Sequence, residues 1–150
     1  MTTAFGMLAQ LCGLTQREAA ELLGVRPDTV KAWWRGRRRA PRAVLEQLAQ
    51  LAETIDRAAA EAGAETDRLI EEGPGAPDLL ELGVARDDAE ARTLGWPCVG
   101  AHEAVLARVA AAAIRTGLDI AVVPRASTPA TATAARAHRK RTGAGSDPGY

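Results

Sequence analysis

Residues 14–41 read LTQREAAELLGVRPDTVKAWWRGRRRAP, and the first half of this stretch has the signals of a short helix. Thr15 and Glu18 form a T-x-x-E capping box, in which each side chain accepts a hydrogen bond from a free backbone N–H at the helix start. Gly24 suits the left-handed residue that ends a helix. The pattern predicts a two-turn helix over residues 16–23.

The second half of the stretch predicts another short helix, over residues 27–35. Pro27 suits the first helical position, where its missing N–H would have no partner, and Asp28 favours the positive end of the helix dipole. Gly36 ends this helix as Gly24 ends the previous one. Two short helices joined by a tight turn are the plan of a helix-turn-helix.

The two helices have separate apolar and polar faces. A small residue, Ala19, suits the point where the helices cross. The expected apolar anchors beneath them are Leu22, Leu23, Val25, Val30 and Trp33. The expected hydrogen-bonding groups on the outer face of the second helix are Arg26, Asp28, Thr29, Lys31 and Arg35. A DNA major groove is about 12 Å wide and admits one helix that presents such groups.

Two tryptophans lie side by side in the second helix. Trp33 follows Val30 by three residues, so we expect it in the core. Trp34 is rotated by about 100° from it. Three positions stay open for Trp34: against the following long helix, against a C-terminal unit or partner chain, or stacked on nucleic acid.

Three arginines, Arg37, Arg38 and Arg39, follow the second helix directly. A run of charge is most often solvated surface, but a helix-turn-helix places this segment beside the DNA backbone, so we expect phosphate contacts. Asp28 would be repelled by phosphates unless it accepts a hydrogen bond from a cytosine or braces an arginine such as Arg26. We favour the bracing.

The flanking segments are also expected to be helical. Residues 4–12 have apolar positions at helical spacing and end at Gly13. Residues 41–73 read as a long helix with a weak, alanine-rich apolar seam, which packs on its own domain or meets a second subunit at its far end. Gly63 is a candidate break in this helix.

A second unit is expected after GPGAPD, residues 73–78. We predict strands over residues 79–84 and 119–124 and a helix over residues 101–116, with Gly117 as its stop. Residues 125–150 have almost no large apolar side chain, and we predict that they are disordered.

These elements predict a mainly α fold that is α+β overall. It comprises an N-terminal helix-turn-helix bundle with a long connecting helix (residues 1–72), a small strand-containing dimerisation unit (73–124) and a basic tail (125–150). The core should be thin, because the chain has only five aromatic residues, so a partner subunit is expected to add stability.

The formal net charge of zero conceals a strong asymmetry. Residues 1–44 carry eight Arg and Lys against three acidic residues, whereas residues 45–103 carry four against fourteen. This pattern predicts a basic front that binds a polyanion and an acidic middle with another role.

Little in the chain indicates catalysis or a membrane. Cys12 and Cys98 lie far apart, and His102 and His138 complete no zinc pattern, so we expect buried thiols, no metal and no cofactor. His102 near a helix start and Trp96 in the core have structural explanations. We find no catalytic triad and no glycine-rich loop after a strand, so we do not expect an enzyme. With no leader and no apolar span of about 20 residues, the protein is expected to be cytoplasmic.

The stretch from residue 14 to residue 41 resembles the lambda-repressor-like (Xre-type) helix-turn-helix family, and the resemblance covers residues 1 to about 60. The matching positions are Thr15, Gln16, Ala19, Leu23, Gly24, Val25, Thr29, Val30, Trp33, Gly36 and Pro41. The resemblance implies that Gln16 and Arg17 contact phosphates. It also implies that Arg26, Asp28, Thr29 and Ala32 face bases, with Lys31 and Arg35 at the groove edge. Trp34 and Pro27 depart from the family, which usually has polar residues there.

The wider layout is more loosely similar to the anti-CRISPR-associated autorepressors, through residues 41–51 and 96–112. The resemblance implies a homodimeric, sequence-specific repressor of transcription, autoregulatory, which binds an inverted-repeat operator in double-stranded DNA. Two alternatives stay open: an antitoxin-type regulator whose C-terminal unit binds a partner protein, and a regulator that also binds RNA.

Overall fold

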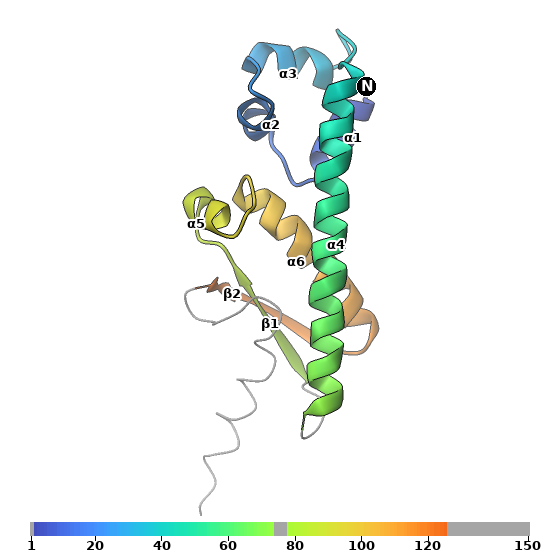
Figure 1. The fold of residues 1–150 in the computed structure, drawn as a ribbon, viewed down its shortest axis with the longest axis vertical. Coiled ribbons are helices and arrows are strands. Elements are labelled where there is room, and N and C mark those ends of the chain that lie inside the picture. Colours follow the sequence, from blue (N-terminus) through green and yellow to red (C-terminus); the bar gives the residue numbers. More distant parts are fainter. Residues whose placement is uncertain (1, 74–77, 126–150) are drawn as a thin grey trace, which may run out of the picture. The chain divides into compact units, whose positions relative to one another are not determined.

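The computed structural model describes residues 2–73 and 78–125. In this range the chain forms six helices and two strands (Figure 1). In chain order they are α1 (Ala4–Leu11), α2 (Gln16–Leu23), α3 (Pro27–Trp34), α4 (Arg42–Glu72), β1 (Leu79–Val84), α5 (Asp88–Thr93), α6 (Val99–Arg115) and β2 (Asp119–Pro124). The fold is mainly helical with a small sheet, which confirms the expected α+β class.

The described residues divide into two compact units. The first comprises residues 2–58 and 85–105, and the second comprises residues 59–73, 78–84 and 106–125. Helices α4 and α6 each contribute residues to both units. The functional boundaries expected after residues 72 and 124 stay a prediction.

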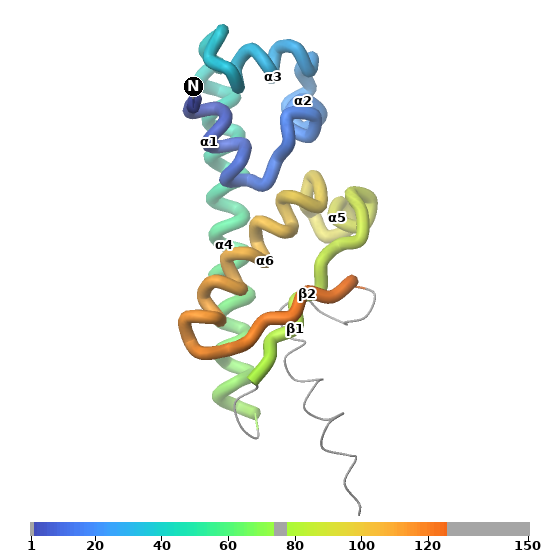
Figure 2. Tube along the Cα trace, turned by 180° about the vertical axis from the view of Figure 1, so that it is seen from behind, coloured from blue at the N-terminus to red at the C-terminus, as the bar shows by residue number. Residues whose placement is uncertain are grey.

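The first unit contains α1, α2 and α3 with the beginning of α4 (Figure 2). Helix α1 lies against α4, where the buried Cys12 thiol donates a hydrogen bond to the carbonyl of Leu48 at 3.3 Å. Both Cys12 and Cys98 are free and buried, as expected. The core of this unit consists mainly of small and aliphatic side chains, with Phe5 and Trp33 as its large aromatics.

Backbone segments far apart in the sequence meet at two glycines of the first unit. Gly13 lies in the turn after α1, and Gly100 is the second residue of α6. A Cβ atom built on Gly100 would lie 2.0 Å from the carbonyl oxygen of Gly13, which is far inside van der Waals contact. The start of α6 can therefore approach this turn only because neither residue has a side chain.

His102 has a structural role in the same unit. Its side chain is buried, and its Nδ1 accepts a hydrogen bond from the backbone N–H of Ala85 at 3.2 Å. This bond connects α6 to the residue that follows β1. Trp96, expected in the core, is only half-buried, because it lies in the loop between α5 and α6.

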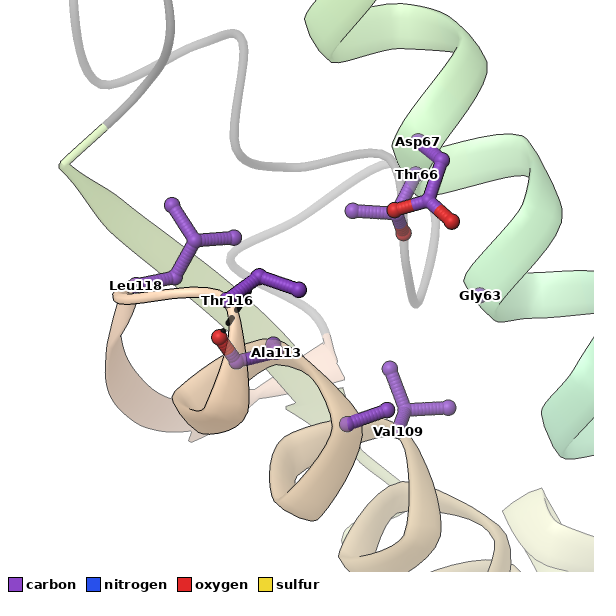
Figure 3. A pocket seen from close by; sticks show the side chains of 8 residues that line it. Gly63, Thr66, Asp67, Val109, Ala113, Thr116 and Leu118 are labelled. Carbon is purple, nitrogen blue, oxygen red and sulfur yellow. Dashed lines mark hydrogen bonds between the residues drawn. The ribbon is translucent and has the colours of Figure 1, made fainter.

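The second unit contains a two-stranded parallel sheet with the ends of α4 and α6. Leu79 of β1 pairs with Asp119 of β2, and the register continues to Val84 and Pro124. Thr66 and Asp67 of α4 lie across a small pocket from Val109 and Ala113 of α6 and from Thr116, which follows that helix (Figure 3). Both strands and helix α6 were predicted from the sequence, and they are confirmed.

One expectation about the elements was wrong, and one element was not predicted. Gly63 does not break α4, which runs unbroken over 31 residues. A glycine costs a helix interior about 1 kcal/mol but keeps its backbone N–H, so strong helix formers on both sides carry the helix through it. Helix α5 was not predicted, although Asp87 caps it by accepting a hydrogen bond from the N–H of Glu90 at 2.8 Å.

Two further expectations concern residues that the structure does not describe. The predicted change of unit at residues 73–78 falls largely on residues 74–77. The predicted disorder of the tail concerns residues 125–150, of which only Arg125 is described.

Candidate nucleic-acid interface

Helix α2 begins and ends as the sequence predicts. The N–H of Thr15 donates to the Glu18 carboxylate at 2.8 Å, and the N–H of Glu18 donates to the Thr15 hydroxyl at 3.2 Å. Gly24 adopts a φ of 64°, and the N–H of Val25 bonds the Ala20 carbonyl at 3.1 Å. This bond and the left-handed glycine make the Schellman ending that turns the chain sharply toward α3.

The buried face of α2 differs from the predicted one. Ala19 and Ala20 are buried, whereas Leu22, expected as an anchor, is 44% exposed. The helix therefore buries the stripe of Ala19, Ala20 and the half-buried Leu23, and Leu22 lies outside it. The sequence shows an apolar face but does not show which side of it meets another helix.

The inner face of α3 is fixed by Val30 and Trp33. Val30 is fully buried, and only 6% of Trp33 is exposed, so the expected core position of Trp33 is confirmed. The rings of Phe5 and Trp33 meet edge to face, with their centroids 5.4 Å apart. Helix α3 thus packs on α1 through aromatic contact and on α2 across the turn.

Trp34 contacts a helix that the sequence interpretation did not consider for it, α1. Its ring lies edge to face against Phe5 of α1, with centroids 6.0 Å apart, and a Cβ on Gly6 would be 3.5 Å from its Nε1. The Thr3 hydroxyl donates to the Trp34 carbonyl at 3.2 Å. Helix α1 lies beside the end of α3 and packs on Trp34, which is half-buried, and contact of its exposed part with a partner chain or with nucleic acid stays a prediction.

Thr3 is a positioning residue that the sequence interpretation missed. Its hydroxyl oxygen accepts a hydrogen bond from the N–H of Gly6 at 3.0 Å, which caps α1, while its O–H bonds the end of α3. The available signal was a threonine directly before an apolar helix, which is a common N-cap.

The outer face of α3 presents polar side chains to solvent. Asp28, Lys31 and Arg35 follow one another at helical spacing and are exposed, while Thr29 and Ala32 are half-buried at the margins. Arg26, which precedes the helix, is exposed and makes no capping bond with its side chain. Asp28 does not brace Arg26; it forms an exposed ion pair with Lys31 at 3.8 Å, because residues three apart are neighbours on a helix.

The arginine run leaves α3 in a defined direction. Gly36 has a φ of 75°, and the N–H of Arg37 bonds the Ala32 carbonyl at 2.9 Å. Arg37, Arg38 and Arg39 are all exposed. The stretch from residue 29 to residue 45 contains six Arg and Lys and no acidic residue.

The basic side chains of this region are available to a ligand. Among residues 2–73 and 78–125, no carboxylate forms an ion pair with Arg26, Arg35 or any member of the arginine run. On α2, Gln16 is half-buried, and Arg17 is exposed with a long 3.9 Å contact to Glu21. All the residues that the sequence analysis assigned to nucleic-acid contact lie in the first unit, on α2, on α3 or in the segments directly before and after α3.

Other chemistry finds little support in the described residues. Burial raises the pKa of the Cys98 thiol, so this group stays protonated and unreactive. In the part of the chain that the structure describes, no group of three or more His, Cys, Asp or Glu residues is arranged to hold a metal ion. None of the described helices is long and apolar enough to cross a membrane.

Comparison with protein families agrees with this geometry. Residues 4–62 match a helix-turn-helix domain. The matched region includes α1, α2 and α3 and two-thirds of α4, and it contains every candidate contact residue. This match supports a helix-turn-helix regulator that binds DNA. No curated protein matches the chain.

Proposed function

We propose that the protein is a homodimeric, sequence-specific repressor of transcription that occupies an inverted-repeat operator, including one that controls its own gene. In this proposal α3 enters the major groove. Arg26, Asp28, Thr29 and Ala32 face base edges there, and Lys31 and Arg35 lie at the groove edge. Repression follows from occupation of a promoter and needs no chemistry.

One observation carries the proposal: the two faces of α3 are fully separated. Val30 and Trp33 anchor its inner side in the core, so Asp28, Lys31 and Arg35 on the outer side stay exposed, with Thr29 and Ala32 half-buried at its margins. A helix that reads a groove needs this arrangement, because base contacts depend on side chains held by a rigid scaffold.

Phosphate contacts complete the proposed interface. Gln16 and Arg17 are in the first turn of α2, where free backbone N–H groups and the helix dipole favour an anion. Arg37, Arg38 and Arg39 follow α3 without competing carboxylates. Such contacts give affinity and register on the duplex, while the groove contacts give sequence preference.

A homodimer accounts for specificity that one short helix cannot supply. A recognition helix covers only a few base pairs, and two helices related by a two-fold axis read half-sites about one helical turn apart. The proposed autoregulation and the Xre-type and anti-CRISPR-linked assignment come from the resemblance of residues 14–41, 41–51 and 96–112.

Selection of DNA from a random pool tests this function. The full chain is incubated with duplexes at moderate salt, and the bound fraction is sequenced. We expect enrichment of an inverted repeat with half-site centres about 10 base pairs apart, and we expect that repeat upstream of the gene. No enriched motif, or equal affinity for a structured leader transcript, would contradict a sequence-specific DNA repressor.

A further inference from the structure

The sheet of the second unit is covered unevenly. In the parallel register, Leu80 pairs with Ile120 and Leu82 pairs with Val122, and paired residues lie on the same face of a sheet. Leu80 and Leu82 are fully buried, but Ile120 is half-buried and Val122 is 65% exposed. The layer that covers this apolar face therefore ends before β2.

Among residues 2–73 and 78–125, no strand pairs with the outer edge of β2. The N–H of Asp119 bonds the Asp78 carbonyl at 2.9 Å, so alternate residues starting at Asp119 point toward β1. Ile120 and Val122 then point their N–H and C=O groups away from β1. Among the described residues the sheet has only these two strands. Parallel sheets are normally covered on both faces, and a two-stranded sheet is marginal by itself.

We propose that β2 pairs with β2 of a second copy, antiparallel and centred on Val122, to form a four-stranded sheet with the order β1-β2-β2-β1. The proposal rests on the homodimer of the proposed function and specifies how the two copies join. A two-fold axis through this pairing makes the contact self-complementary, as a symmetric dimer requires.

The register follows from the pattern of β2. With Val122 opposite the partner's Val122, the central pair can exchange both backbone hydrogen bonds. Ile120 lies opposite the partner's Pro124, whose carbonyl can accept from the Ile120 N–H although proline has no N–H to return. Asp119 lies opposite the partner's Arg125, so opposite charges meet at both ends.

A second copy fits this edge better than the remainder of the same chain. Residues 126–150, which follow β2, contain no Val, Ile, Leu, Met, Phe or Trp, so they have no large aliphatic side chain with which to cover Val122. A second β2 brings its own Ile120 and Val122 to the same face. The strand carries no charge between Asp119 and Arg125 that would oppose its self-association.

Sedimentation velocity of the full chain tests the interface. We expect wild type to be a dimer and Val122→Lys to raise the dimer Kd at least about 10-fold, because two ammonium groups would face each other on a sheet edge. Met7→Lys changes another exposed apolar residue, in the first unit, and should leave the Kd unchanged. Circular dichroism checks that each variant is folded.

Oxidative crosslinking tests the register independently. The Cα atoms of a directly opposed pair of this kind are about 5.5 Å apart, which a disulfide can span. Val122→Cys should therefore form a disulfide-linked dimer, and Ala121→Cys, which would face the partner's Val123, should not. Cys12 and Cys98 are buried, so we expect little crosslinking through these two native thiols.

The outcomes separate this proposal from the proposed function. A wild-type dimer that survives Val122→Lys and gives no Val122→Cys crosslink overturns the β2 interface and leaves a homodimeric repressor intact. A monomeric wild type overturns the homodimer and the interface together. A monomeric Val122→Lys variant that still binds one half-site supports the interface and retains the role of α3.

Discussion

Trp33 and Trp34 are consecutive in α3 but have different surroundings. One step along a helix rotates a side chain by about 100°, so the two rings cannot share a face. Trp33 faces the core, and Trp34 lies at its edge against α1. Phe5 contacts both rings and connects them. The position of α3 therefore depends more on Trp33 than on Trp34.

This difference predicts two unequal losses of stability. Trp33→Ala should lower the free energy of unfolding by about 3–5 kcal/mol, because it empties a buried site. Trp34→Ala should lower it by about 1–2 kcal/mol, because its ring is only half-buried. Urea unfolding followed by circular dichroism gives both values. A larger loss for Trp34→Ala than for Trp33→Ala would contradict the described packing.

For single residues, the sequence predicts those positions that depend only on spacing along a helix. The spacing of Trp33 from Val30 was sufficient to place Trp33 inward. The partner of Trp34 could not be predicted, because it depends on where α1 lies. The exposure of Leu22 could not be predicted for the same reason. Which side chains of α2 are buried depends on the other helices that pack against it, and the sequence of α2 does not show where they lie.

Among the elements, α4 and α6 each contain a glycine with a different environment. Gly100 of α6 meets the backbone of Gly13, and nothing lies within 4 Å of a Cβ built on Gly63 of α4. Gly63 borders the small pocket between α4 and α6 in the second unit (Figure 3). One glycine is required for packing, and the other only weakens its helix.

Substitution of each glycine by alanine should shift stability in opposite directions. Gly100→Ala should destabilise the protein by about 1–3 kcal/mol, because backbone atoms must move to admit the methyl group. Gly63→Ala should stabilise it by about 1 kcal/mol through helix propensity alone. Thermal unfolding of both variants measures the difference. An unchanged or higher Tm for Gly100→Ala would refute the close approach of Gly13 and Gly100.

The ends of most elements could be predicted because caps are local signals. The Thr15 box, the first-turn Pro27 and the glycine stops define α2 and α3 within the sequence itself. Helix α5 was missed because its cap at Asp87 opens only six helical residues without an apolar face. The parallel pairing of β1 with β2 joins residues about 40 positions apart, and no local pattern encodes such a contact.

For the molecule as a whole, charge separates the candidate interface from the acidic middle of the chain. Basic residues predominate before residue 45 and acidic residues predominate from there to residue 103. This asymmetry favours approach of a polyanion to the helix-turn-helix region and disfavours its binding to residues 45–103. The contact of residues 85–105 with residues 2–58 could not be predicted from charge or from any other sequence pattern. It depends on the close approach of Gly13 and Gly100, which are far apart in the sequence.

The most direct measurement of the central claim is equilibrium binding of the selected operator by Arg26→Ala/Lys31→Ala and by Arg57→Ala/Arg115→Ala. Both double variants remove two exposed positive charges, but only the first removes them at α3. We expect the first to lose about 100-fold in affinity and most of its preference over a scrambled duplex. The second should retain both. Equal losses in the two variants, or an unchanged operator preference in the first, would contradict recognition of DNA by the outer face of α3.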